Sequence, residues 1–160
     1  MTRTARHTRD VHSRRRQRGL ATVEFVVAAP FVLLLLLGCT EIGRAFIHYA
    51  TLTYAVRDAT RFVTTNAING TTGVVQLSNT VITEAKNLAV YGHVGGTGNA
   101  RLPSFQTGQV VVTDVGSSNI QVTATYPYQP MLGAVLPGLM GNSMNLGFTM
   151  VVAVTMRAIS

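Results

Sequence analysis

The residues that could carry out catalytic or metal chemistry are few in this 160-residue chain. Beyond residue 19 there are two histidines, His48 and His93, and five acidic residues, namely Glu24, Glu41, Asp58, Glu84 and Asp114. None of these has the spacing of metal ligands, and no serine lies in a nucleophile elbow. The glycine-rich stretch 92–98 (GHVGGTG) lacks the Gly-Lys-Ser/Thr sequence of a phosphate-binding loop. The sequence therefore favours a protein that is not an enzyme and has no cofactor, metal or small-molecule substrate.

One carboxylate has an unusual position, because Glu24 lies within an apolar run that begins at Leu20. Residues 1–19 form a basic leader that ends at Gly19. A basic leader, a glycine and an apolar helix with glutamate as its fifth residue are the pattern of a prepilin-type cleavage site between Gly19 and Leu20. A carboxylate within a membrane helix costs about 2.5–3.5 kcal/mol on insertion scales, so Glu24 needs a compensating partner. In pilin-like proteins that partner is the new α-amino group of a neighbouring helix; alternatively, Glu24 lies among the headgroups and pairs with Arg18.

The apolar run Leu20–Thr40 predicts a transmembrane helix. Its 21 residues include five consecutive leucines, Leu33–Leu37, and at about 1.5 Å per residue they reach roughly 30 Å, the thickness of a bilayer's hydrocarbon core. The arginines before the run place the N-terminus in the cytoplasm by the positive-inside rule. We therefore expect a single-pass protein of the cytoplasmic (inner) membrane whose C-terminal part lies outside the cytoplasm.

The positive charge of the chain is concentrated in the leader. Residues 1–19 hold seven arginines and one acidic residue, whereas the rest of the chain holds six basic and five acidic residues. The pI of about 10.5 is therefore a property of the leader. A nucleic-acid-binding fold would need basic residues spread over a folded face, so the sequence predicts no nucleic-acid partner.

Two other kinds of N-terminal processing remain open. The sequence around Cys39 loosely resembles a lipobox, which would make the chain a lipoprotein cleaved before Cys39. The leader could also stay attached, which would make the chain a signal-anchored extracytoplasmic binding protein.

The helical pattern continues beyond the apolar run, and residues 41–65 are amphipathic. The remainder, 66–160, predicts an α+β head with a helix over 78–91 and strands over about 109–115, 120–128 and 145–157. We expect these strands to form a small antiparallel sheet with one apolar face, on which the long helix packs through Phe46, Tyr49, Leu52 and Val56. The apolar segment 131–140 either packs under the sheet or forms an exposed patch.

The segment 14–65 resembles the N-terminal region of the TadE-like family, minor pilins or pseudopilins of the tight-adherence (Tad/Flp) pilus system. The shared features are the basic leader, Gly19, the pair Glu24–Phe25, Pro30 before the leucines, Glu41-Ile42-Gly43-Arg44, and the stretch 57–61 (RDATR). The resemblance implies a pilin-like fold, cleavage by a prepilin peptidase, a membrane anchor, and an assembly role in which Glu24 and Phe25 contact other subunits. It also implies membrane lipid, other pilins and pseudopilins, and Tad platform proteins as partners.

Overall fold

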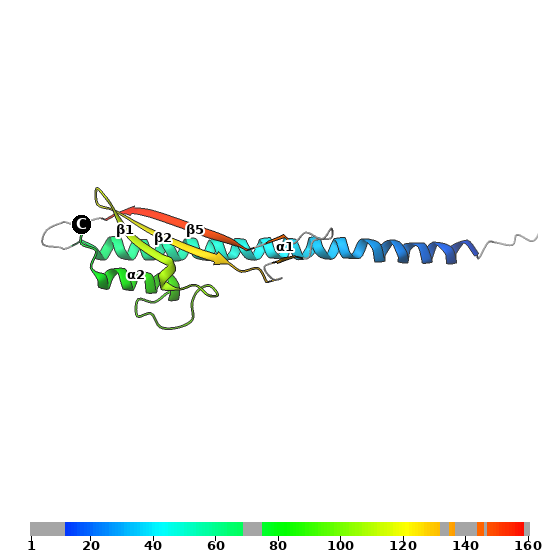
Figure 1. The fold of residues 1–160 in the computed structure, drawn as a ribbon, viewed down its shortest axis with the longest axis horizontal. Helices are drawn as coiled ribbons and strands as arrows, with labels where there is room; N and C mark the ends of the chain where they lie inside the picture. Colours follow the sequence, from blue (N-terminus) through cyan, green and yellow to red (C-terminus); the bar gives the residue numbers. More distant parts are fainter. Residues whose placement is uncertain (1–11, 69–74, 132–134, 137–143, 146, 159–160) are drawn as a thin grey trace, which may run out of the picture. The chain divides into compact units, whose positions relative to one another are not determined.

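The structure is a computed structural model that describes residues 12–68, 75–131, 135–136, 144–145 and 147–158. Within these ranges, the side chains of residues 12–19, 135–136 and 144–145 are not described. In chain order the elements are α1 (His12–Asn66), α2 (Asn79–Tyr91), the 3-10 turn η1 (Thr107–Gln109), β1 (Val110–Gly116), β2 (Asn119–Tyr128), β3 (Val135–Leu136), β4 (Met144–Asn145) and β5 (Phe148–Arg157) (Figure 1). The chain divides into two compact units, Met1–Thr40 and Glu41–Ser160. We call the second unit the head.

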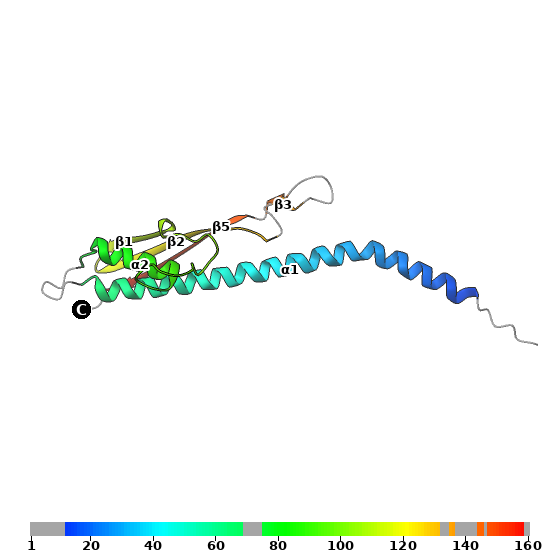
Figure 2. The same ribbon diagram turned by 90° about the horizontal axis from the view of Figure 1, so that it is seen from below.

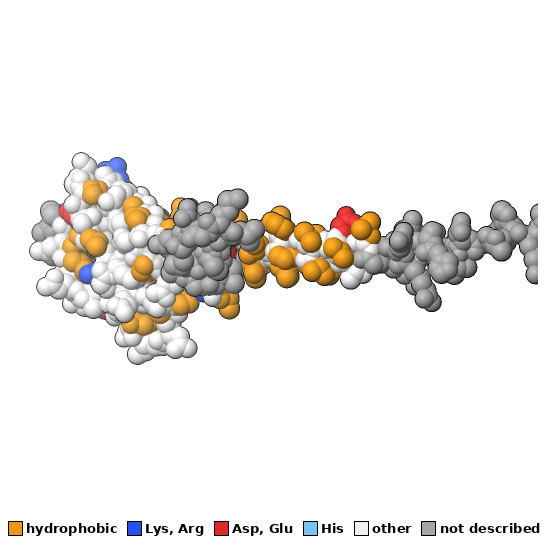
Figure 3. Space-filling model, turned by 45° about the vertical axis from the view of Figure 1, so that its right-hand side comes forward, with side chains coloured by type: hydrophobic (Ala, Val, Ile, Leu, Met, Phe, Trp, Pro, Cys, Tyr) orange, Lys and Arg blue, Asp and Glu red, His pale blue; other side chains and the backbone are white. Residues whose placement is uncertain are grey.

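Residues 20–40 of α1, within the first unit, are apolar except for the exposed Glu24. The most apolar 18-residue window of this stretch has no buried residues. Figure 3 shows hydrophobic side chains along the stretch, together with acidic side-chain atoms. Pro30 lies inside the helix, which membrane helices tolerate. Of the helices that the structure describes, this is the one long and apolar enough to cross a membrane. A helix that is apolar all round needs apolar surroundings, so this stretch suggests a membrane anchor.

The head is a two-layer α+β structure, as the sequence predicts. Its sheet has the order β1-β2-β5, with both pairs antiparallel, and the head part of α1 lies beside α2 on one face of the sheet (Figures 1 and 2). The central strand β2 alternates regularly, with Ile120, Val122, Ala124, Tyr126 and Tyr128 buried against the helices. Strand alternation and helical spacing thus present two apolar surfaces that bury each other.

A tight hairpin joins β1 to β2. Ser117 and Ser118 both have positive φ, 53° and 61°, which is the conformation of a type I′ turn and matches the twist of paired strands. The side-chain amide of Asn119 donates hydrogen bonds to the carbonyl oxygens of Gly116 and Ser117. These bonds support a turn that lacks the usual Asn-Gly sequence.

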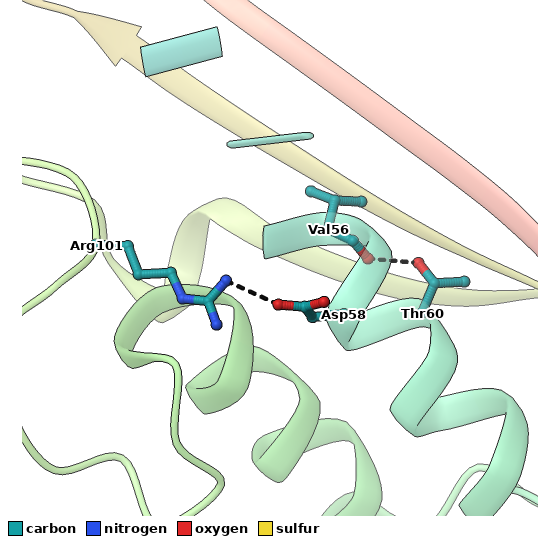
Figure 4. Close-up of polar contacts among 4 residues, drawn as sticks. All are labelled: Val56, Asp58, Thr60 and Arg101. Carbon is teal, nitrogen blue, oxygen red and sulfur yellow. Dashed lines mark hydrogen bonds and ion pairs between the residues drawn. The ribbon is translucent and has the colours of Figure 1, made fainter. Parts of the chain in front are cut away.

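Helix α2 has clear end signals. The Ser78 hydroxyl accepts a hydrogen bond from the Val81 amide as the N-cap, and Gly92 ends the helix with φ 75°. Beyond α2, the guanidinium of Arg101 forms an ion pair with Asp58 of α1 at 3.0 Å (Figure 4). This exposed pair links the loop after α2 to α1, although such surface pairs contribute at most about 1 kcal/mol.

Of the four residues that the sequence predicts to pack on the sheet, two are buried and two are exposed. Leu52 and Val56 are completely buried in the core with residues of all three strands. The prediction is wrong for Phe46 and Tyr49, which expose 70% and 49% of their surface. The buried side chains of α1 form a stripe with a spacing of three or four residues. Phe46 and Tyr49 each come one residue after a member of this stripe, so their side chains are rotated by about 100° around the helix from that member. The members of that stripe are Ala45, His48, Leu52, Val56, Ala59 and Val63.

The other predicted elements differ from the structure mainly at their ends. Helix α2 and strands β1 and β2 begin and end within one residue of the predicted ranges. The predicted third strand, 145–157, instead comprises the end of β4 and a separate β5, and Leu146 lies outside the described residues. Most of segment 131–140 also lies outside them; Met131 is exposed, and Val135–Leu136 pairs with Met144–Asn145.

We predict that Leu52→Ala strongly destabilises the head and that Phe46→Ala does not. Leu52 is fully buried, and truncating a buried leucine typically costs about 2–5 kcal/mol, whereas Phe46 makes no core contact to lose. The measurement is thermal unfolding of the full chain in detergent, where Leu52→Ala should lower the melting temperature by several degrees. Equal melting temperatures for the two variants would contradict the packing of α1 on the sheet.

Candidate functional site

The residues of the predicted cleavage and assembly site lie on a continuous stretch of α1. The helix runs through Gly19 and Leu20 without a break. Leu20, Glu24 and Phe25 are all exposed. No side chain that the structure describes forms a hydrogen bond or ion pair with Glu24, and the side chain of Arg18 is not among those described. The carboxylate of Glu24 is thus presented on the helix surface, one turn beyond Leu20.

The head part of α1 also presents apolar side chains away from the sheet. Ile42, Phe46, Ile47 and Tyr54 are each more than half exposed. They lie off the buried stripe, between residues 42 and 54, and Arg57, Asp58 and Arg61 replace them further along the helix. The first three turns of α1 in the head therefore have two apolar sides, of which the sheet covers one.

A cluster of polar and aromatic side chains joins the start of α1 in the head to the end of β2. Glu41, Arg44 and His48 lie at helical spacing on one side of α1, and Tyr126 and Tyr128 alternate on the inner face of β2. We call these five residues the polar cluster. Helical spacing on one element and strand alternation on the other bring together residues that are about 80 positions apart in the chain.

Glu41 is held by hydrogen bonds from β2 and the segment after it. The Tyr128 hydroxyl donates to Glu41 Oε1 at 2.5 Å, and the Met131 backbone amide donates to the same carboxylate at 3.3 Å. Burial, and next the hydrogen bond to Glu41, raise the pKa of Tyr128 to about 12. The hydroxyl therefore stays protonated, and remains a donor, at any physiological pH.

His48 is held from the other side by Tyr126. The Tyr126 hydroxyl lies 3.0 Å from the Pro103 carbonyl oxygen and 3.3 Å from His48 Nδ1. Because the carbonyl can only accept, the single hydroxyl hydrogen goes to Pro103, and the Tyr126 oxygen accepts from Nδ1–H of His48. Burial, and next the positive charge of Arg44, lower the pKa of His48. His48 is therefore a neutral histidine with its proton on Nδ1.

The polar cluster connects two elements of the fold and lacks the features of a catalytic or metal site. It contains no nucleophile activated by a base, and the described residues include no group of three or more His, Cys, Asp or Glu side chains that could hold a metal ion. Its hydrogen bonds instead fix the first two turns of α1 in the head to the end of β2. An unpaired buried carboxylate or imidazole would be costly, and these contacts avoid that cost.

Sequence reasoning missed this cluster. It considers His48 only as a possible metal ligand, whereas the structure buries this side chain, which is 9% exposed. Two signals were present: the spacing of Glu41, Arg44 and His48, and the alternation of Tyr126 and Tyr128 at the end of a predicted strand. Neither signal identifies its partner, because the two segments are brought together only by the fold.

Comparison with protein-family models gives a match between residues 19–61 and the TadE model, described as TadE-like protein. The match confirms the resemblance noted in the sequence over this part of the chain. It begins at Gly19 and covers the apolar helix and most of its continuation, but not the sheet. The comparisons with curated proteins and with solved structures gave no match.

We predict that the stability of the head falls as the pH drops below about 6.5, the ordinary pKa of histidine. His48 has a lowered pKa in the folded state, so the unfolded chain takes up the proton more readily. The contribution of His48 is therefore complete above the unfolded pKa and is lost as the pH falls through the lower folded value. The measurement is the melting temperature of the full chain in detergent between pH 8 and pH 5.

His48→Gln should reduce this pH dependence because glutamine does not titrate. The matched control is His93→Gln, which removes an exposed histidine of the loop after α2 and should keep the wild-type pH dependence. If His48→Gln follows the wild-type curve throughout, another group is responsible for the acid sensitivity.

Proposed function

We propose that this chain, whose residues 19–61 match the TadE-like family of Tad pilus systems, is a non-enzymatic minor pilin or pseudopilin. Its work is structural: it is anchored in the cytoplasmic membrane by one helix and takes part in the assembly of a Tad-type (Flp) pilus or secretion apparatus. The observation that carries the proposal is the match itself, because it covers the predicted cleavage site, the anchor and the beginning of the head together. In this proposal the N-terminus lies in the cytoplasm and the head lies outside it, because the leader arginines favour that orientation.

The exposed carboxylate of Glu24 supports an assembly role for the anchor. After cleavage behind Gly19, Leu20 would carry a positively charged α-amino group, four residues from Glu24. Pairing between Glu24 and the amino group of an adjacent subunit would offset the cost of a carboxylate in hydrocarbon and would fix the axial register of neighbouring helices. Phe25 follows Glu24 in the chain and is also exposed, so it is available for contact with another subunit.

The exposed apolar side of α1 in the head supports contacts with other subunits as well. Phe46, Ile47 and Tyr54 are presented on the side of the helix that the sheet does not cover. Exposed apolar surface of this kind is typical of interaction sites. Other pilins, pseudopilins and platform proteins of the apparatus are the partners that we propose for it, and a prepilin peptidase is the partner for residues around Gly19.

Two alternatives differ from the proposal in the mass of the mature protein. A signal-anchored extracytoplasmic binding protein would keep its leader. A lipoprotein would begin at a diacylated Cys39, and Cys39 is exposed on α1. Cleavage at that position would divide the continuous helix α1 and remove most of its apolar stretch.

We predict that the protein from native membranes begins at Leu20 and contains 141 of the 160 residues. Gly19→Leu should block this cleavage and leave the full-length form in the membrane, because the peptidase reads the small residue before the cut bond. Intact-mass and N-terminal analysis of both proteins makes the measurement. A wild-type protein that begins near Met1, or at a lipid-modified Cys39, would contradict the proposed processing.

We predict that Glu24→Ala is inserted and cleaved normally but does not join the pilus apparatus. Removal of the carboxylate favours insertion, whereas the amino group of the neighbouring subunit loses its partner. The measurement pairs cleavage, by mass, with co-purification of the pilus machinery. The matched variant Glu24→Asp keeps the charge and should retain part of the assembly. Wild-type assembly of Glu24→Ala would show that the carboxylate only lies among the headgroups.

A further inference from the structure

One charged side chain of the polar cluster, Arg44, has a buried donor without a hydrogen-bond acceptor in the described part of the chain. Nη1 of Arg44 is buried and has no hydrogen-bond partner among the residues that the structure describes. The guanidinium carbon lies 6.0 Å from the centre of the Tyr128 ring, which is a cation–π contact. This contact does not supply a hydrogen-bond acceptor for Nη1. Arginine has five N–H donors and cannot give up its proton, so an unmatched buried donor of this kind calls for an anion. Arg44 as a whole is only partly buried, so an external group can approach it.

No carboxylate of the described part of the chain forms an ion pair with Arg44. Glu41, one turn away on α1, already accepts from Tyr128 and from the Met131 amide. The ion pair that the described part of the chain contains, between Arg101 and Asp58, uses a second acid. The remaining acidic residues of the head, Glu84 and Asp114, lie on α2 and β1, and no other acidic side chain follows residue 41 in the sequence.

The position of Arg44 along α1 indicates where its anion comes from. Arg44 follows the end of the apolar run, Thr40, by four residues of continuous helix, which is about 6 Å. The polar headgroup layer on each side of the hydrocarbon core is about 5–8 Å thick. On an anchor helix, Arg44 would therefore stand at the depth of the lipid phosphates.

The aromatic side chains at the level of Arg44 along α1 fit the same depth. Tyr128 stacks on the half-exposed Phe148 with ring centres 5.1 Å apart. Figure 2 shows that β2 ends and β5 begins at the end of the head where α1 enters it. Phe46 and Tyr49, which do not pack on the sheet, are exposed on the adjoining turn of α1. Tyrosine rings at this level of the helix are typical of the membrane–water interface, where tyrosine is enriched.

We propose that Arg44, lying against Tyr128 where α1 enters the head, binds the phosphodiester anion of a lipid headgroup. Arginine and phosphate form charge-assisted hydrogen bonds, and a phosphate that approaches the exposed part of the Arg44 side chain would compensate the positive charge of the guanidinium. Glu41 contributes by holding Tyr128 in place, so that the ring supports the guanidinium from one face. The contact would hold the head at a fixed height above the membrane. The inference rests on the membrane anchorage in the proposed function and not on assembly into a pilus.

The test is residue-level cross-linking to a lipid probe. The full chain is reconstituted in phosphatidylglycerol vesicles that contain a phosphatidylglycerol analogue with a diazirine on its headgroup, and the labelled residues are mapped by tandem mass spectrometry. We expect label on residues around Arg44, and Arg44→Gln should lower this label about fivefold, since a basic residue near an anionic surface is worth about 1 kcal/mol. Arg61→Gln, an exposed arginine on the same helix, is the matched control and should leave the label unchanged.

Three results would overturn the inference. Equal label around residue 44 in wild type and Arg44→Gln would show that the arginine does not hold the headgroup. Loss of label in the presence of excess inorganic phosphate, to the level of Arg44→Gln, would assign the site to a free anion. Equal loss in Arg44→Gln and Arg61→Gln would indicate general charge attraction. Failure of the proposed anchorage is distinguishable from all three, because the chain would then not float with the vesicles at all.

Discussion

A single helix in this protein has to meet the demands of two environments. Over Leu20–Thr40, α1 is apolar apart from Glu24, and its large apolar side chains are exposed in the isolated chain. Over the head, the same helix buries one stripe beneath the sheet, where Leu52, Val56 and Ala59 are fully enclosed. Among the described elements, α1 and α2 are the helices on which the sheet packs, so the described core of the head depends on the continuation of α1 past its apolar run.

The polar cluster lies where one pattern changes into the other. Glu41 is the first charged residue after the apolar run. Its carboxylate accepts hydrogen bonds from the Tyr128 hydroxyl and the Met131 amide. His48, one turn before the first fully buried leucine of the stripe, is neutral and bonded to Tyr126. Satisfied polar groups of this kind specify one register of packing, because sliding the helix by a turn would leave a carboxylate or an imidazole buried without its partner.

The surfaces that we propose for assembly lie outside this packing. Glu24 and Phe25, and the apolar side chains between Ile42 and Tyr54, are exposed on α1. The sheet and α2 hold one side of the helix in the head and leave the other side available. The family match covers the helix from Gly19 to Arg61 and not the sheet, which is consistent with an assembly role carried by α1 and a head that supports it.

The sequence by itself determined the elements and their order. Length and hydropathy define the apolar helix, and strict alternation in β2 identifies its buried face, since both patterns are set by local geometry. The basic leader, Gly19 and Glu24 likewise form a pattern that can be read within a dozen residues.

Only the tertiary structure decided which side of α1 the sheet covers. Phe46 and Tyr49 are large and largely apolar, like Leu52, and helical spacing allows more than one stripe through residues 42–63, so a choice by hydrophobicity alone selects the larger side chains. The structure instead packs Ala45 against the core and buries His48 against the rings of Tyr126 and Tyr128 at the end of β2. The partners of His48 and Glu41 lie 78 and 87 residues further along the chain. No local pattern encodes a contact over such a separation, which is fixed only when the helix and the sheet bury each other.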